Sequence, residues 1–100
     1  MALEPATGDE LAGQVHDAVQ QLAGVAGVGS GRRDQILTYL PGSTIAGVVV
    51  DDATITIEVV GTYPPAGSYV ELAGVVRARV RQLAPTHDID VTISDIRTEA

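Results

Sequence analysis

The chain of 100 residues contains no cysteine, no phenylalanine, no tryptophan and no lysine. Without cysteine it has no disulfide framework, no thiolate zinc site and no cysteine nucleophile. Small secreted domains usually depend on disulfides, so the absence favours a reducing interior. Only three tyrosines supply aromatic rings. The core must therefore be built from valine, isoleucine, leucine and alanine.

Long apolar runs and positive charge are also scarce. No stretch approaches the 18 or so apolar residues of a membrane span, and the first ten residues lack the basic and apolar regions of a signal peptide. The formal charge of −7 disfavours binding to nucleic acid or to anionic lipid. We therefore expect a cytoplasmic protein with no nucleic-acid partner and no direct membrane insertion.

The length and the hydrophobic content set the domain organisation. One hundred residues make one domain, and a hydrophobic fraction of 45% is ordinary for a globular protein. Residues 1–6 are predicted to form a disordered tail, and residues 7–100 a single domain.

Two segments have helical periodicity. The first begins at a predicted capping box, Thr7 with Glu10, and ends near Gly24; its apolar stripe is Leu11, Val15, Ala18, Val19 and Leu22. The second begins at Ser68 as N-cap, runs to about Leu83 and is ended by Pro85. Its predicted buried stripe is Tyr69, Leu72, Ala73, Val76, Val80 and Leu83.

The remaining apolar segments indicate strands. Short strands are expected near residues 25–29 and 36–40, the second ended by Pro41-Gly42. Residues 45–50 and 54–60 are predicted to form a hairpin around Asp51-Asp52, because residues 54–60 alternate strictly between apolar and polar. Residues 61–67 are predicted to be a stiff loop, and residues 89–93 a half-buried strand.

The order of these elements predicts an α+β fold. The simplest arrangement is a two-layer sandwich, in which a three- to four-stranded, mainly antiparallel sheet has both helices on its apolar face. The element order is α-β-(β)-β-β-α-β.

A glycine-rich segment, residues 27–31, precedes Arg32 and Arg33 and invites comparison with a phosphate-binding loop. A dinucleotide fingerprint needs glycines that open a helix directly after a strand, and a triphosphate loop needs Gly-Lys-Ser/Thr. Neither pattern is present. We therefore interpret Gly27, Gly29 and Gly31 as residues of tight turns or close backbone packing.

Acidic and histidine residues offer weak candidate sites. His87, Asp88 and Asp90 could form a metal site, but such sites normally need three or four converging ligands, and His16, beside Asp17, is distant in sequence. Asp51-Asp52 fits a turn. No serine among Ser30, Ser43, Ser68 and Ser94 has the context of an activated nucleophile. We expect no catalytic residue, no cofactor and no metal.

Arg77 and Arg81 lie four residues apart on the second helix and are predicted to share its outer face, whereas Arg79 projects differently. Such a pair could receive an acidic partner or phosphate groups. A solvated surface, with cations near the C-terminal end of the helix, is the favoured interpretation.

The order and spacing of several short motifs, over roughly residues 10–97, resemble the alkaline-shock-protein family of envelope stress response proteins, in the short, arginine-rich form of high-GC Gram-positive bacteria. The motifs are Val25-Ala26-Gly27-Val28-Gly29, Thr38-Tyr39-Leu40-Pro41-Gly42, Ile45-Ala46-Gly47-Val48, residues 55–63, Glu71-Leu72-Ala73 and Ile89-Asp90-Val91-Thr92-Ile93. The sequence departs from the family pattern in two places. Residues 1–6 are too short and polar for the extra strand that often precedes the first helix, and Pro64-Pro65-Ala66-Gly67-Ser68-Tyr69 stands where a Gly-Pro segment is usual.

The resemblance implies a non-enzymatic cytoplasmic protein linked to cell-envelope stress. Members of the family self-associate and are sometimes held at the inner face of the membrane by a protein partner. The resemblance assigns no catalytic residue. Two alternatives stay open at this point: a domain that senses a small ligand or a metal, motivated by residues 27–31 and His87, and, with less support, a hydrolase.

Overall fold

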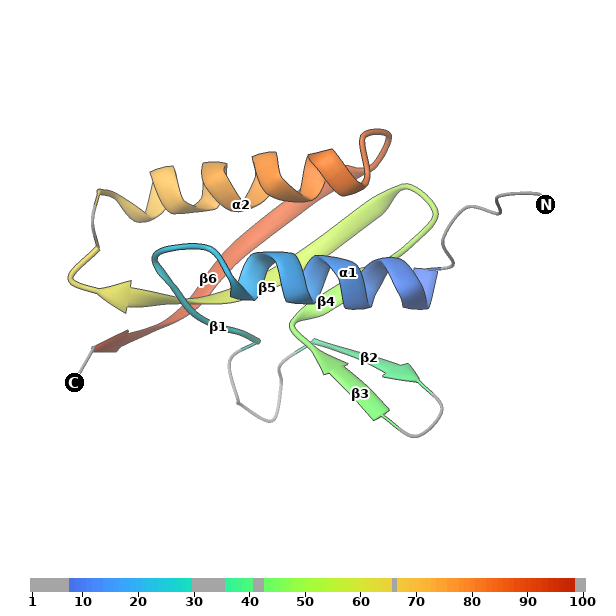
Figure 1. Cartoon of the computed structure of the whole chain (residues 1–100), viewed down its shortest axis with the longest axis horizontal. Helices are drawn as coiled ribbons and strands as arrows, with labels where there is room; N and C mark the ends of the chain where they lie inside the picture. The colour runs from blue at the N-terminus through green and yellow to red at the C-terminus, as the bar shows by residue number, and fades with distance from the viewer. Residues whose placement is uncertain (1–7, 30–35, 41–42, 66, 99–100) are drawn as a thin grey trace.

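The structure, a computed structural model, describes residues 8–29, 36–40, 43–65 and 67–98. It contains two helices, α1 (Gly8–Gln20) and α2 (Tyr69–Leu83). Its strands are β1 (Val25–Val28), β2 (Leu37–Leu40), β3 (Ser43–Ala46), β4 (Val48–Val50), β5 (Thr54–Tyr63) and β6 (Asp88–Thr98). Figure 1 shows their arrangement. The predicted α+β class is confirmed, and the elements follow in the predicted order, except that one predicted strand is divided in two.

The main sheet is organised around β5. Strand β6 pairs with β5 in parallel along its whole length, from Thr54 to Tyr63. The other edge of β5 is shared by β4, antiparallel to residues 55–57, and β1, antiparallel to residues 59–61. The parallel pair is joined through α2, because parallel strands need a long crossover connection.

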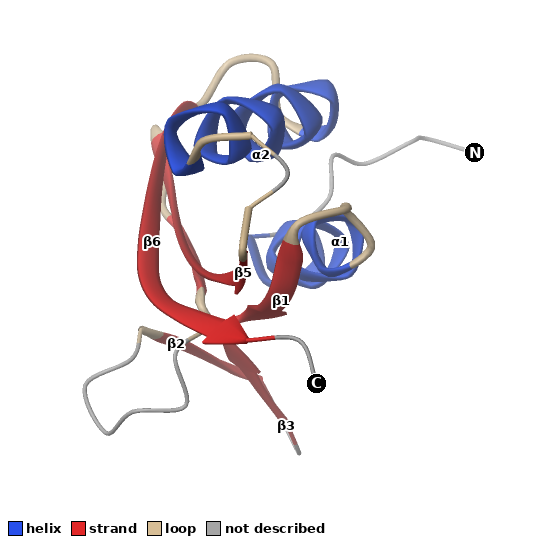
Figure 2. Cartoon of the chain, turned by 90° about the vertical axis from the view of Figure 1, so that its left-hand side faces the viewer, coloured by secondary structure: helices blue, strands red, loops and turns tan. Residues whose placement is uncertain are grey.

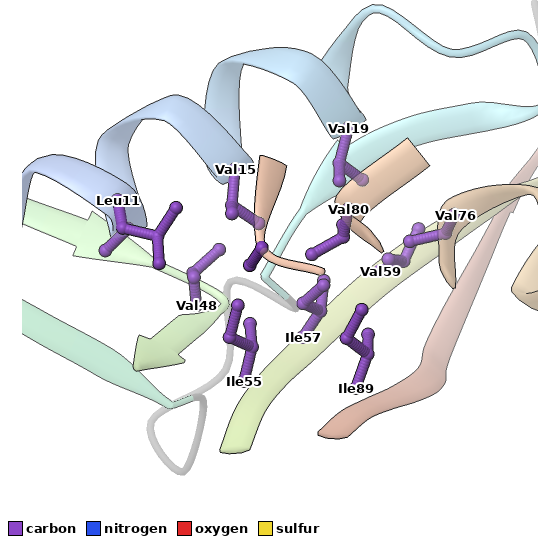
Figure 3. Close-up of a cluster of buried hydrophobic side chains, with 12 residues drawn as sticks. Leu11, Val15, Val19, Val48, Ile55, Ile57, Val59, Val76, Val80 and Ile89 are labelled. Carbon is purple, nitrogen blue, oxygen red and sulfur yellow. The ribbon is translucent and has the colours of Figure 1, made fainter. Parts of the chain in front are cut away.

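Both helices lie on the same side of this sheet (Figure 2). The predicted alternation of β5 is confirmed, since Ile55, Ile57 and Val59 are fully buried. They pack with Val15 and Val19 of α1 and with other members of one aliphatic cluster (Figure 3). Burying each such side chain stabilises the fold by roughly 1.5–3 kcal/mol. The cluster also includes Leu11, Ala12, Val48, Val76, Val80, Ala84 and Ile89.

The predicted single strand over residues 45–50 is wrong, because Gly47 divides it into β3 and β4. Gly47 has φ +81°, and a Cβ there would lie 2.2 Å from Gly29 N and 2.8 Å from Glu58 O. The ends of β1 and β4 meet at this point: Gly29 N donates to Glu58 O at 2.7 Å, and Glu58 N donates to Gly47 O at 2.7 Å. Strand β3 turns away here and pairs with β2 in a separate hairpin.

The two strands that border α2 are longer than predicted. Strand β5 continues to Tyr63 and β6 to Thr98, so the loop expected over residues 61–67 begins only at Pro64. Each strand supplies hydrogen-bond partners for the backbone N–H and C=O groups of the other. This pairing joins segments that are far apart in the sequence, so the local sequence could not indicate it. A register shift in β6 leaves Ser94 as an extra residue between Ile93, opposite Val59, and Asp95, opposite Val60.

The predicted start of α2 is confirmed. Ser68 Oγ accepts from Glu71 N at 3.0 Å, and Ser68 N donates to Glu71 Oε2 at 3.5 Å, which forms a capping box. The helix ends at Leu83, before Pro85. Helix α1 ends at Gln20, and a turn follows in which Gly24 has φ +89°. Thr7 and the predicted tail, residues 1–6, lie outside the described residues.

Candidate interaction surfaces

The described part of the glycine-rich segment, which contains Gly27 and Gly29, has a structural role. Gly27 lies inside β1, and Gly29 is buried with φ +89° at the junction with Gly47. The Gly29 N–H is already bonded to Glu58 O, so it is not available to a phosphate. This agrees with the interpretation as close packing. Gly31, Arg32 and Arg33 lie outside the described residues.

The acidic residues beside His87 do not converge. Asp88 and Asp90 are exposed while Ile89 between them is buried, as the alternation predicts. His87 is half-buried, and its Nδ1 has no hydrogen-bond partner among the described residues. His16 lies beside Asp17 on α1. Within the part of the chain that is described, no group of three His, Asp or Glu residues could hold a metal ion.

The structure places the other candidate catalytic residues in a turn, in strands and at a helix cap. Asp51 and Asp52 are exposed in the turn between β4 and β5, where Asp51 N donates to Thr54 O at 2.8 Å. Ser68 caps α2, and Ser94 Oγ donates to Val59 O at 3.4 Å. Ser43 lies in β3, and Ser30 falls outside the described residues.

The arginines of α2 do not form the predicted solvated pair. Arg77 is half-buried and its Nε donates to Ile89 O at 3.3 Å, whereas Arg81 is exposed. Asp88 N donates to Ala53 O, so the backbone of Asp88 faces β5. Along a strand, the backbone N–H and C=O groups of successive residues point alternately to its two edges. The Ile89 carbonyl therefore points away from β5. Arg77 therefore covers part of the outer edge of β6.

Sequence reasoning missed the exposed apolar side chains. Of the five large ones that are exposed among the described residues, four lie on or near the first half of α2. Tyr63 ends β5, and Val70 and Val75 belong to α2. Ile96 pairs with Gly61, over which the Tyr69 ring packs. The fifth, Tyr39, is 74% exposed on β2. The helical spacing of the sequence places Val70 and Val75 off the buried stripe of α2. It does not show which other exposed side chains lie near them in the fold.

A hollow of about 170 Å³ opens beside the start of α2, and Val75 is one of the residues that line it. Its walls come from the turn after α1, the end of β5 and the start of α2, which Figure 1 shows one above the other at the left. The residues that line it include Ala23, Gly24, Tyr69, Glu71, Leu72 and Val75.

The hairpin of β2 and β3 lies at the other end of the long axis, at the lower right of Figure 1. Its inner face is anchored, since Thr38 Oγ1 donates to Val48 O and Ile45 Cδ1 lies close to Gly13 of α1. Tyr39 pairs with Thr44 on the opposite face, and both are exposed. The ten residues 37–46 contain no charged side chain.

No family model matches the sequence, and no curated protein matches it. Among solved structures, a doubly substituted form of the MamM CTD is similar with a TM-score of 0.49 and 13% sequence identity, over 95% of this chain and 98% of that chain. A likeness at this level carries no argument about function. Among the described helices, neither is long and apolar enough to cross a membrane.

Proposed function

We propose that this protein is a non-enzymatic interaction module of the envelope stress response, which acts by self-association or by docking onto a membrane-linked protein at the cytoplasmic face. The observation that carries the interaction role is Tyr39. It is a large amphipathic side chain left 74% exposed on a hairpin whose other face is anchored.

An exposed tyrosine suits recognition for physical reasons. Tyrosine is enriched at protein interfaces, because its ring buries a large apolar area while its hydroxyl keeps a hydrogen bond. Burying it in a partner removes apolar surface from water at roughly 25 cal/mol per Å². An isolated two-stranded hairpin is only marginally stable, so the anchoring by Thr38 and Ile45 holds Tyr39 in position before any partner arrives.

The stress-response role rests on the resemblance of the motifs. The block of residues 38–42, one of the motifs that carries it, lies in and directly after β2 and includes Tyr39. The interaction role also agrees with the placing of the candidate catalytic residues. Asp51 lies in the turn between β4 and β5, and Ser68 caps α2.

The test compares three forms of the whole protein: wild type, Tyr39→Ala and the matched control Thr44→Ala, which changes the exposed neighbour on the same face. Sedimentation over a concentration series measures self-association, and affinity capture from native cells measures retained partners. We expect Tyr39→Ala to lose the association that the wild type and the control show. A wild type that is monomeric and retains no protein would refute the proposal.

A further inference from the structure

The hollow at the start of α2 is held open by glycine and has fixed walls. Gly24 has no side chain, and a Cβ there would lie 3.3 Å from Leu72 Cδ1. The Gly24 carbonyl accepts from Thr62 N at 3.0 Å, and Tyr69 Oη donates to Thr62 O at 2.9 Å. Both walls are therefore tied to the end of β5. The hollow needs no rearrangement before it is filled.

The volume decides what class of occupant fits. Sites for cofactors and other small molecules have volumes of roughly 300–1,000 Å³, whereas a cavity of about 150 Å³ holds one benzene ring. At about 170 Å³, this hollow matches one aromatic or large aliphatic side chain. The rim adds apolar contact, because Val75 is half-exposed beside it. A side chain from a protein is the fitting occupant.

One lining residue adds a polar requirement. Glu71 is exposed, and its Oε2 takes part in the capping box with Ser68. Its other oxygen, Oε1, has no donor among the residues that the structure describes. A carboxylate is a strong acceptor, and a hydroxyl that donates to it forms a charge-assisted bond. The hollow thus favours a ring that carries a donor, which is the chemistry of tyrosine.

The chain itself presents such a side chain. Tyr39 is exposed on the uncharged hairpin of β2 and β3. Figure 1 shows this hairpin at the other end of the long axis from the start of α2, where the hollow lies. Two copies of a protein with a net charge of −7 repel each other. A contact made by the uncharged residues 37–46 adds no further negative charge next to Glu71. The hairpin is therefore well suited to meet this surface in a second copy.

We infer that the hollow at the start of α2 receives the Tyr39 side chain of a second copy, with the Tyr39 hydroxyl donating to Glu71. This inference rests on the proposed interaction function and names the partner and the two contact sites. The two sites are different surfaces at opposite ends, and we infer that each copy makes one such contact with the next copy, head to tail, which is a heterologous contact. Such contacts repeat from copy to copy and build rings or open chains, not closed dimers.

Three variants separate the two sites: one removes the tyrosine and two block the hollow. Tyr39→Ala removes the inserted side chain and keeps the hollow. Ala23→Trp places a large ring at the exposed rim and blocks the hollow while Tyr39 is kept, and Val75→Trp is a second blocking variant. The matched control is Ala78→Trp, because Ala78 is exposed on α2 but does not line the hollow. Thermal melting checks that each variant is folded.

The experiment is sedimentation velocity of the purified whole chain, up to about 1 mM so that weak contacts are populated. The wild type and Ala78→Trp should grow beyond dimers with concentration, whereas Tyr39→Ala and the blocked variants should stay monomeric. Loss of the ring should weaken association roughly 30-fold or more. Tyr39→Phe keeps the ring and loses only the bond to Glu71, so we expect about a tenfold weaker association.

The decisive sample is a mixture of Tyr39→Ala with Ala23→Trp. One variant supplies only the hollow and the other only the tyrosine, so the mixture should form a one-to-one dimer and nothing larger. A mixture that stays monomeric, or a wild type that stays monomeric, overturns this inference. If Tyr39 nevertheless captures another protein from cells, the proposed function survives. If it captures nothing, both fail.

Discussion

Replacing Gly47 with alanine should destabilise the fold severely, because three costs coincide at this residue. The backbone has φ +81°, which costs an L-residue roughly 1–2 kcal/mol. The new Cβ would lie 2.2 Å from Gly29 N, and relieving such overpacking costs about 1–3 kcal/mol. The shift would also break the bond from Gly29 N to Glu58 O, worth about 1 kcal/mol.

These costs sum to roughly 3–6 kcal/mol, against a total stability of about 5–15 kcal/mol for a domain of this size. With about 4–8 °C per kcal/mol, the melting temperature of Gly47→Ala should fall by at least about 12 °C. Urea and thermal denaturation followed by circular dichroism would measure the change.

Gly27→Ala is the matched control for this prediction. Gly27 lies two residues from the same junction, but its φ is not positive and a Cβ there would meet no atom within 4 Å. We expect this substitution to change the free energy of unfolding by less than about 1 kcal/mol. If Gly47→Ala costs no more than Gly27→Ala, the explanation for the break between β3 and β4 is wrong.

Three further predictions use the same assays. Gly74→Ala should stabilise the protein by about 1 kcal/mol, because Gly74 is exposed inside α2 with open space around it; a loss of stability would count against the α2 boundaries. Ile57→Ala should cost roughly 2–5 kcal/mol and Thr56→Ala, on the other face, less than about 1 kcal/mol, and equal costs would contradict the one-sided core. Divalent metals and nucleotides should leave the melting temperature unchanged, because Asp88 and Asp90 do not converge with other ligands. A ligand at 100 times its Kd would add about 2.7 kcal/mol, and such a shift would favour the sensor alternative.

The fold class and the helices could be predicted because their signals are local. The N-cap Ser68, the stop before Pro85 and the alternation of residues 54–60 depend on neighbours within a few positions. The break at Gly47 has a tertiary cause, the approach of Gly29, which lies eighteen residues earlier. The extension of β5 to Tyr63 likewise depends on β6, which follows about thirty-five positions later in the chain.

The interaction surfaces were harder to predict. The hollow is formed by the turn at Ala23, the end of β5 and the start of α2, which are far apart in the sequence. Tyr39 looks like an ordinary strand residue until β2 is seen to pair, among the described strands, only with β3. Arg77 was expected in solvent, and only the position of β6 reveals its bond to the Ile89 carbonyl. Exposure and proximity of this kind follow from the assembled fold.

The proposed interaction requires above all that Tyr39 is a contact residue in the cell. A photoreactive residue placed at position 39, in cells that naturally make the protein, tests this directly when compared with the same residue at Asp52, an exposed turn position. We predict protein adducts at position 39, including a second copy linked near Glu71, and few or none at position 52. Equal labelling at the two positions, or no adduct at position 39, would contradict the account.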